Sequence, residues 1–262
     1  MADKLKPENK EIVERIRKFE DEMFKEHSFK LYRNYHVPED LVQRSTKVLS
    51  FGVGGDAHFE KLICFDNEKL QVHMFDPTPY TVKNIGSILS KGGHHQFKNY
   101  ANAEELSKKI IQHNLTFKPY AYAPENGKLK FYYKTQTDAS LPVENLTSFS
   151  LACEFDNPEN YVEVECRNIK TIMHAIGWDK IDILKTDVEG LWYDVGKELQ
   201  DLDVKYWITE IELGLGETYD ESFEKLRHLC KIHSNEYNIY VNRKRLKAMM
   251  EIIFYRKDID ES

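Results

Sequence analysis

The chain has 262 residues, of which 41% are hydrophobic and 12% aromatic, and its formal net charge is −7. This length and apolar content suit one packed α/β domain with a small extension and exclude a disordered chain. The acidic balance gives no general attraction to nucleic acid, because that binding depends on neutralising phosphates.

Neither a signal peptide nor a membrane helix is expected, because residues 1–10 lack an apolar segment and no apolar run approaches ~20 residues. The four cysteines lie far apart without a C-x-x-C pair, so neither a zinc knuckle nor a dense disulfide framework is indicated. We therefore expect a reduced, soluble, cytoplasmic protein that has no nucleic-acid or membrane partner.

The first predicted element is an amphipathic helix over residues 8–27, in which apolar side chains recur at helical spacing. A tyrosine-rich segment over residues 31–40 follows and turns at Pro38. We expect residues 1–45 to form an N-terminal helical extension or lid, and residues 46–262 to form a Rossmann-like domain.

From residue 47 onward, predicted strands and helices alternate. The predicted strands cover residues 47–51, 71–75, 115–123, 129–134, 161–165, 181–187, 204–213, 237–242 and 251–256. The predicted helices cover residues 57–66, 80–90, 103–114, the segment ending near 176, 191–199 and 219–233. Asn126 and Gly127 indicate a hairpin turn, and residues 135–160 a long loop.

This order of elements predicts an α/β fold with a doubly wound, mostly parallel sheet of about seven strands. The last two strands are joined by a short connection, which is typical of antiparallel neighbours at a sheet edge. The predicted architecture is therefore a Rossmann-like sheet with an antiparallel C-terminal strand and an N-terminal helical extension.

The ends of the first two main strands predict a nucleotide site, because open parallel sheets bind ligands at the carboxyl ends of their strands. Strand 47–51 runs into Gly52–Gly55, and glycine lets a ligand approach the main chain without a Cβ in the way. Strand 71–75 ends at Asp76, close to the ~20-residue interval at which a Rossmann acid reaches a ribose diol.

NAD is the competing ligand for such a site. Its G-x-G-x-x-G fingerprint requires glycine where this chain has Ala57, which is only the tolerated variant. A pyrophosphate also favours an uncrowded helix N-terminus, whereas Asp56 places a negative charge there. A cofactor that carries a sulfonium and an amino-acid ammonium group suits Asp56 better.

The fourth main strand carries a more specific motif. Residues 182–190 read D-I-L-K-T-D-V-E-G, which resembles the signature of the FkbM-type methyltransferases. Residues 72–79, 120–129 and 251–256 resemble, in order, the family's second strand with its acid and proline, its third-strand hairpin and its last strand. The resemblance covers residues 48–257 and implies S-adenosylmethionine as the cofactor.

The glycine turn, the strand ends and the resemblance together assign the cofactor-binding residues. These are Phe51, Gly52, Val53, Gly54, Gly55, Asp56, Asp76, Pro77, Tyr122 and Asp187. Two positions depart from the family. An acid often stands two residues before the first glycine, where this chain has Ser50, and another two residues after the E-G pair, where it has Trp192.

The predicted catalytic residues are Asp187 and Glu210. Methyl transfer requires donor and acceptor to be aligned, and a hydroxyl acceptor also requires that its proton be taken up. We assign Asp187 to orienting the cofactor's methionine end or the acceptor, and Glu210, on the neighbouring strand, to the base. Glu189 is expected to anchor the turn, and the alternative is that Glu189 and Glu212 cap helices or face solvent.

A divalent cation is compatible with grouped carboxylates and His94 or His95, but the spacing does not require one, so no metal ligand is assigned. The leading prediction is O-methylation of a hydroxyl on a small molecule or glycan, the class that the resemblance favours. The alternatives are N-methylation of a small molecule or protein, with an acceptor pocket lined by Trp192, Tyr193 and Tyr122, and a degenerate Rossmann domain without catalysis. No pattern in the sequence indicates an oligomeric state.

Overall fold

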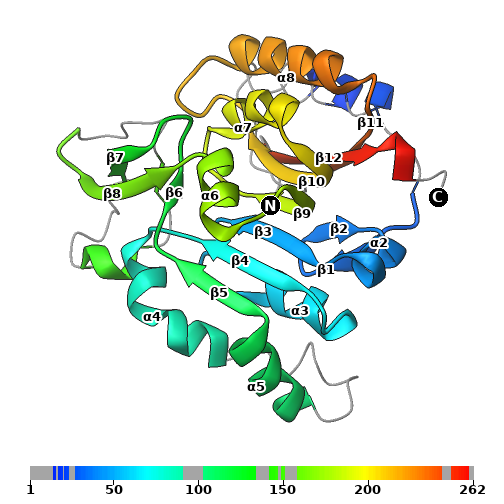
Figure 1. Ribbon diagram of the computed structural model, residues 1–262. Coiled ribbons are helices and arrows are strands. Elements are labelled where there is room, and N and C mark those ends of the chain that lie inside the picture. The colour runs from blue at the N-terminus through cyan, green and yellow to red at the C-terminus, as the bar shows by residue number, and fades with distance from the viewer. Residues whose placement is uncertain are drawn as a thin grey trace, which may run out of the picture.

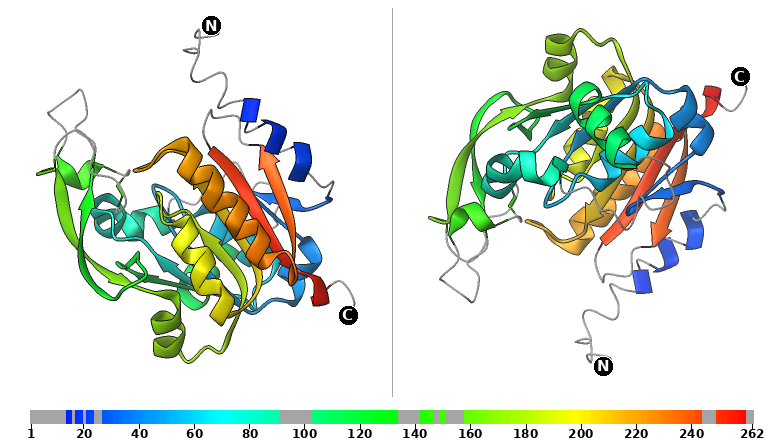
Figure 2. Two further views of the ribbon diagram at one scale, coloured as in Figure 1. Left: turned by 90° about the horizontal axis from the view of Figure 1, so that it is seen from above. Right: turned by 90° about the horizontal axis from the view of Figure 1, so that it is seen from below.

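A computed structural model of the chain describes residues 14–15, 17–19, 21–23, 27–90, 103–133, 142–146, 149–150, 158–243 and 249–259. Over these ranges the chain forms a central seven-stranded sheet with helices on both faces (Figures 1 and 2). The predicted fold class is confirmed. No helix in these ranges combines the length and the apolar character needed to cross a lipid bilayer.

The seven strands lie in the order β11-β12-β10-β9-β3-β4-β5. Their bounds are β3 (Lys47–Phe51), β4 (Gln71–Phe75), β5 (Leu115–Lys118), β9 (Lys180–Thr186), β10 (Asp203–Glu212), β11 (Tyr237–Arg243) and β12 (Met249–Arg256). Strand β12 runs antiparallel to both β10 and β11, as predicted. The strand order reverses between β3 and β9, so this is where an open α/β sheet binds its ligand.

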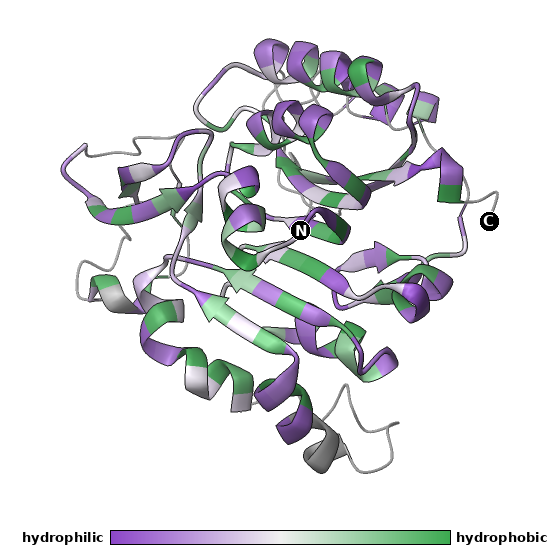
Figure 3. Ribbon diagram, viewed as in Figure 1, coloured by the Kyte–Doolittle hydropathy of each residue, from purple (hydrophilic) through white to green (hydrophobic). Residues whose placement is uncertain are grey.

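Helices cover the two faces in two groups. One face carries α6 (Ile169–Ile176), α7 (Trp192–Glu198) and α8 (Tyr219–His233), and the other carries α2 (Glu39–Arg44), α3 (His58–Asp66), α4 (Pro79–Ser90) and α5 (Ala103–His113). Side chains alternate between the two faces along β10. Trp207 packs against the first group of helices, and the next residue, Ile208, packs against the second. Helix α8 mixes hydrophilic and hydrophobic residues along its length, as a surface helix does (Figure 3).

A second, three-stranded sheet was not predicted. It consists of β6 (Ala121–Tyr122), β8 (Tyr161–Arg167) and β7 (Gly127–Tyr132) in that order, and it lies beside the carboxyl ends of the main strands (Figure 1). The predicted strand over residues 115–123 is therefore two strands in different sheets, which separate after Lys118, where Pro119 lacks the N–H that a ladder needs.

The predicted hairpin at Asn126 and Gly127 is wrong, because β6 and β7 both pair with β8 and not with each other. The Asn126 side chain instead accepts a hydrogen bond from the Asn168 N–H at 3.0 Å and donates to the Thr171 hydroxyl at 2.8 Å. Asn126 thus ties this turn to the start of α6. In the predicted loop 135–160, the described residues include a single 3₁₀ turn (Val143–Asn145) and the buried Phe149.

The N-terminal segment forms more than a helix. The described residues between 14 and 23 are helical, and Phe19 is buried in the core beside α8. A hairpin of β1 (Lys30–Tyr32) and β2 (Tyr35–Val37) follows, which was not predicted from the sequence. The Arg33 backbone has φ 63° in the turn of this hairpin. The hairpin packs on the same face of the main sheet as α3.

Candidate functional site

The glycine turn after β3 is locked against the end of β9. Gly52 has φ 78°, and its N–H donates to the Phe75 carbonyl at 2.9 Å. The Asp187 N–H donates to the Phe51 carbonyl at 3.1 Å. A Cβ at position 52 would lie 2.2 Å from the Asp187 carbonyl oxygen, so only glycine fits this position.

Asp76 joins the glycine turn to the start of α4. Its carboxylate accepts hydrogen bonds from the Gly54 N–H at 2.7 Å, the Thr78 N–H at 2.8 Å and the Thr78 hydroxyl at 2.6 Å. The side chain is 2% exposed, and burial raises the pKa of the Asp76 carboxyl while these hydrogen bonds oppose the rise. A carboxylate has about four acceptor positions, so Asp76 retains one for a ligand.

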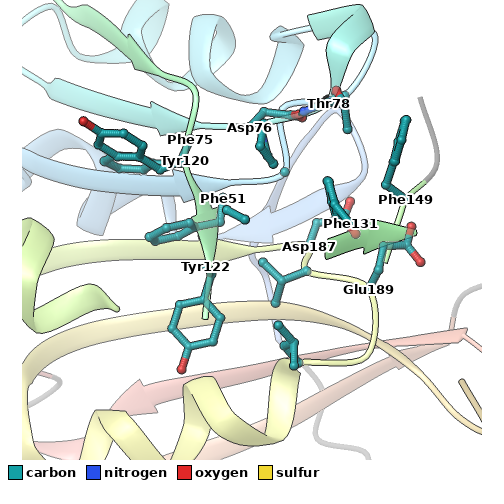
Figure 4. Close-up of a pocket in the computed structure, with 16 residues that line it drawn as sticks. Phe51, Phe75, Asp76, Thr78, Tyr120, Tyr122, Phe131, Phe149, Asp187 and Glu189 are labelled. Atoms are coloured by element: carbon teal, nitrogen blue, oxygen red, sulfur yellow. Dashed lines mark hydrogen bonds between the residues drawn. The ribbon is translucent and has the colours of Figure 1, made fainter. Parts of the chain in front are cut away.

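Beside Asp76 lies a cleft of about 620 Å³, a volume that includes space open to solvent. We call it the aromatic cleft after the rings that line it: Phe51, Phe75, Tyr120, Tyr122, Phe131 and Phe149. Phe51 stacks on Phe75 with ring centroids 4.8 Å apart, and the Tyr122 ring meets Phe51 edge-on. Figure 4 shows Phe51, Phe75, Tyr120 and Tyr122 on one side and Phe131 and Phe149 on the other, with Asp76 and Asp187 between the two groups.

A second cleft, of about 510 Å³, lies on the other side of the glycine turn. Charged and polar groups line it, so we call it the polar cleft: Arg33, Asn34, Tyr35, Asp56, Glu60, Lys185 and Asp187, with Phe59 and the backbone of residues 52–55. Gly52, Gly54 and Asp187 border both clefts, which therefore meet at the glycine turn.

Tyr35 brings the N-terminal hairpin into the site. Its hydroxyl donates to the Asp187 carboxylate at 2.8 Å, and the Lys185 ammonium lies 4.9 Å from its ring centroid. Burial, followed by the charges of Asp187 and Glu210, raises the pKa of the Tyr35 hydroxyl well above its usual value. Tyr35 therefore stays protonated and holds the Asp187 side chain at the junction of the clefts.

Lys185 and Glu60 line the polar cleft next to the glycine turn. The Lys185 ammonium donates to the Gly52 carbonyl and, at 3.3 Å, to the Phe51 carbonyl. Glu60, in the first turn of α3, is 1% exposed and accepts a hydrogen bond from the Ser50 hydroxyl at 2.5 Å. Burial raises the pKa of the Glu60 carboxyl, and the Lys185 charge and the Ser50 bond oppose this rise.

Glu189 follows β9 and lies beside Glu212, the last residue of β10. Burial and the neighbouring Glu212 carboxyl raise the pKa of Glu189 to about 10, so Glu189 is protonated at neutral pH. Glu189 lines the aromatic cleft together with Asp187. Glu210 is not among the residues that line either cleft, although its charge acts on Tyr35 and Glu189.

We expect Glu189→Gln to raise the free energy of unfolding by roughly 1–2 kcal/mol at pH 8. The folded state holds a proton on Glu189 that the unfolded chain, with a pKa near 4.5, has released. Stability is therefore lost as pH rises from the unfolded value toward about 10, and glutamine avoids this loss. Denaturant titrations at pH 5 and pH 8 test this, with the exposed Glu125→Gln as control. A variant less stable than the parent at pH 8 would show that Glu189 is ionised.

The cofactor-binding residues predicted from the sequence fall around these two clefts. The aromatic cleft includes Phe51, Gly52, Gly54, Asp76, Pro77, Tyr122 and Asp187, and the polar cleft adds Val53, Gly55 and Asp56. Tyr35, Glu60 and Lys185 were not predicted from the sequence. Lys185 belongs to the fourth-strand motif, so the family pattern could have indicated it as a site residue. No local sequence pattern indicated Tyr35 or Glu60.

The three aromatic residues proposed for an amine pocket do not line a common cleft. Trp192 is 2% exposed and packs in the core under α7 and α8, and the Tyr193 hydroxyl contacts the His228 ring at 2.9 Å. Tyr122 alone of the three lines the aromatic cleft, and Figure 4 shows its hydroxyl turned away from Asp76 and Asp187. Within the described ranges no three histidine, cysteine or acidic side chains are grouped to hold a metal ion. His94 and His95 lie outside those ranges.

Comparison with protein families matches most of the described domain. A family model described as "Methyltransferase FkbM domain" matches residues 49–239, which contain the glycine turn, Asp76 and the fourth-strand motif. The family resemblance stated from the sequence is confirmed. A search of curated proteins finds no match to the chain.

Solved structures that match the chain at low sequence identity include a fibrillarin and two methyltransferases. Fibrillarin from Methanococcus jannaschii is 11% identical with a TM-score of 0.41, over 82% of this chain and 68% of that chain. Precorrin-6y C5,15-methyltransferase from Geobacter metallireducens is 11% identical with a TM-score of 0.40, over 91% and 96%. The O-methyltransferase TomG from Streptomyces achromogenes, solved in complex with SAM, is 8% identical with a TM-score of 0.40, over 98% and 92%.

Proposed function

The chain belongs to the FkbM methyltransferase domain family, and on that premise we propose that it transfers a methyl group from S-adenosylmethionine to a hydroxyl oxygen of a small molecule or glycan. The observation that carries the proposal is the meeting of an aromatic cleft, a glycine turn and a buried carboxylate at the switch point of the sheet.

The residues present fit this cofactor. At position 52 the Asp187 carbonyl takes the space of a Cβ and fixes the shape of the turn, whereas Gly54 has no atom within 4 Å of its Cβ position, so a ligand can approach the backbone there. The stacked rings of the aromatic cleft suit an adenine base, and the remaining acceptor position of Asp76 suits one ribose hydroxyl. When bound, S-adenosylmethionine supplies a methyl carbon that its sulfonium makes electrophilic.

Asp187 is the residue we assign to the acceptor. It borders both clefts, and its carboxylate is oriented by the Tyr35 hydroxyl at 2.8 Å. A carboxylate in this position accepts the proton that a hydroxyl loses as its oxygen gains a methyl group. The sequence pattern favoured Glu210 as the base, but Asp187 lines the clefts and Glu210 does not, so the geometry favours Asp187. Glu189, in its protonated form, is a hydrogen-bond donor to the acceptor.

An oxygen acceptor is favoured over an amine. Asp187, at the junction of the clefts, can take up the proton that a hydroxyl must lose, and two of the three aromatic residues considered for an amine pocket, Trp192 and Tyr193, lie outside the clefts. We retain residues 1–45 as an extension to the domain of residues 46–262, and assign it a role in completing the polar cleft through Tyr35.

Two measurements on the purified chain test this proposal. Calorimetric titration with S-adenosylhomocysteine tests the cofactor, and transfer of radiolabelled methyl from S-adenosylmethionine to panels of hydroxyl and amine compounds tests the acceptor. We expect saturable binding and label on hydroxyl compounds. Label confined to amines would reassign the chain to N-methylation, and binding without transfer across broad panels would support a domain without catalysis.

A further inference from the structure

We propose that Glu60 binds the ammonium group at the methionine end of the cofactor, in place of the acid that the family often carries at the position of Ser50. The inference rests on the proposed function and identifies how this chain compensates for that departure. Residue 50 is on β3 and residue 60 on α3, and the 2.5 Å hydrogen bond between their side chains brings them to the same point.

Glu60 is a buried carboxylate with few partners. It is 1% exposed, and within the described part of the chain it forms no ion pair, since the Lys185 ammonium is directed to the carbonyls of Phe51 and Gly52. Burying a carboxylate without a paired cation is costly, so such a group is expected to serve a ligand or a local charge balance. Because Glu60 lines the polar cleft, a cation that enters this cleft reaches it.

The polar cleft suits an amino acid, which carries both charges. Glu60 provides an anion for an ammonium group, and the Arg33 guanidinium, which lies 3.3 Å from the Asp56 carboxylate at the edge of the cleft, provides a cation for a carboxylate. The clefts share Gly52, Gly54 and Asp187, so a ligand with its adenosine in the aromatic cleft can extend its amino-acid end across the turn. A charge-assisted hydrogen bond from an ammonium group to Glu60 is of the strong kind.

The competing explanation is that Glu60 only balances the charge of Lys185. The two explanations differ in which ligands depend on Glu60, because S-adenosylhomocysteine contains the ammonium group and 5′-methylthioadenosine lacks the amino-acid end. We expect Glu60→Gln to weaken S-adenosylhomocysteine binding by about tenfold or more. Binding of 5′-methylthioadenosine should stay within about twofold of the parent, since no atom or charge of that ligand reaches Glu60.

Calorimetry with both ligands measures these changes. The matched control is Glu68→Gln, an exposed carboxylate just beyond the other end of α3, which should change neither affinity. The double variant Ser50→Asp/Glu60→Gln returns a carboxylate to the β3 position, and it should recover most of the S-adenosylhomocysteine affinity.

Equal losses for both ligands, or no loss for either, would overturn the inference while leaving the proposed function intact. A double variant as weak as Glu60→Gln would show that positions 50 and 60 do not serve the same group. If the parent chain binds neither ligand, the proposed function fails, and the inference with it.

Discussion

Replacing Gly52 by alanine is expected to weaken binding of S-adenosylhomocysteine strongly and to lower methyl transfer with it. The added Cβ would lie 2.2 Å from the Asp187 carbonyl oxygen, and the backbone φ of 78° is one that alanine rarely adopts. The Asp187 oxygen belongs to the backbone, so it cannot rotate away as a side-chain atom would. Either the turn or the end of β9 must shift, and the junction of the two clefts shifts with it.

The expected cost has two parts. Strain at a positive φ amounts to roughly 1–3 kcal/mol, and displacement of the turn also breaks the alignment of Gly54 with Asp76, whose 2.7 Å hydrogen bond positions the turn. We expect affinity to fall by at least about a hundredfold, equivalent to ~2.7 kcal/mol.

Gly86→Ala is the matched control for this substitution. Gly86 lies in helix α4, and an alanine Cβ at this position would have no neighbouring atom within 4 Å. Alanine there should leave binding unchanged and add up to ~1 kcal/mol of helix stability. Thermal melting and calorimetry on both variants separate folding from binding. Parent-like affinity in Gly52→Ala would contradict the assignment of the turn as the cofactor contact.

Asp187→Asn is expected to lower turnover by roughly 10²–10⁴-fold, the usual contribution of a positioned acid or base. Asparagine keeps an oxygen that accepts from the Tyr35 hydroxyl, so the hairpin should stay in place. Its amide cannot take up the proton of a hydroxyl acceptor. Binding of S-adenosylhomocysteine should therefore change much less than turnover.

Single-turnover rates for Asp187→Asn and Glu210→Gln distinguish the two candidate bases. The geometry predicts the larger loss for Asp187→Asn, because Asp187 borders both clefts and Glu210 lines neither. A large loss in Glu210→Gln beside a near-normal Asp187→Asn would instead support the assignment made from the sequence. Parent-like rates in both would exclude either residue as the base.

The main sheet could be predicted because its signals are local. Each of its strands is a short apolar run with a helical pattern or turn beside it, and the chain order alone indicates parallel pairing. The glycine turn and Asp76 were found for the same reason, since each directly follows a strand. The fourth-strand motif similarly placed Asp187 at a strand end, where the structure has it.

The three-stranded sheet could not be predicted, because its centre is β8, which lies far along the chain from both of its neighbours. The Asn126-Gly127 pair is typical of a hairpin turn, but in the structure the Asn126 side chain bonds to Asn168 and Thr171 instead. Long-range pairing of this kind leaves no trace in local periodicity.

The polar cleft was missed for a related reason. Tyr35 lies in a hairpin of two three-residue strands, too short for a periodic signal, and its contact with Asp187 spans most of the chain. Glu60 reads as an ordinary helix residue until the structure places it against Ser50. The sequence showed that position 50 carries serine where the family often has an acid. Only the fold showed that the Glu60 carboxylate lies beside Ser50.

The most direct test is a crystal structure of the chain with S-adenosylhomocysteine. We expect the adenine among the rings of the aromatic cleft, a ribose hydroxyl within hydrogen-bond distance of Asp76, and the amino-acid end beside Glu60. A nucleoside bound outside these two clefts, or a ribose with no contact to Asp76, would contradict it.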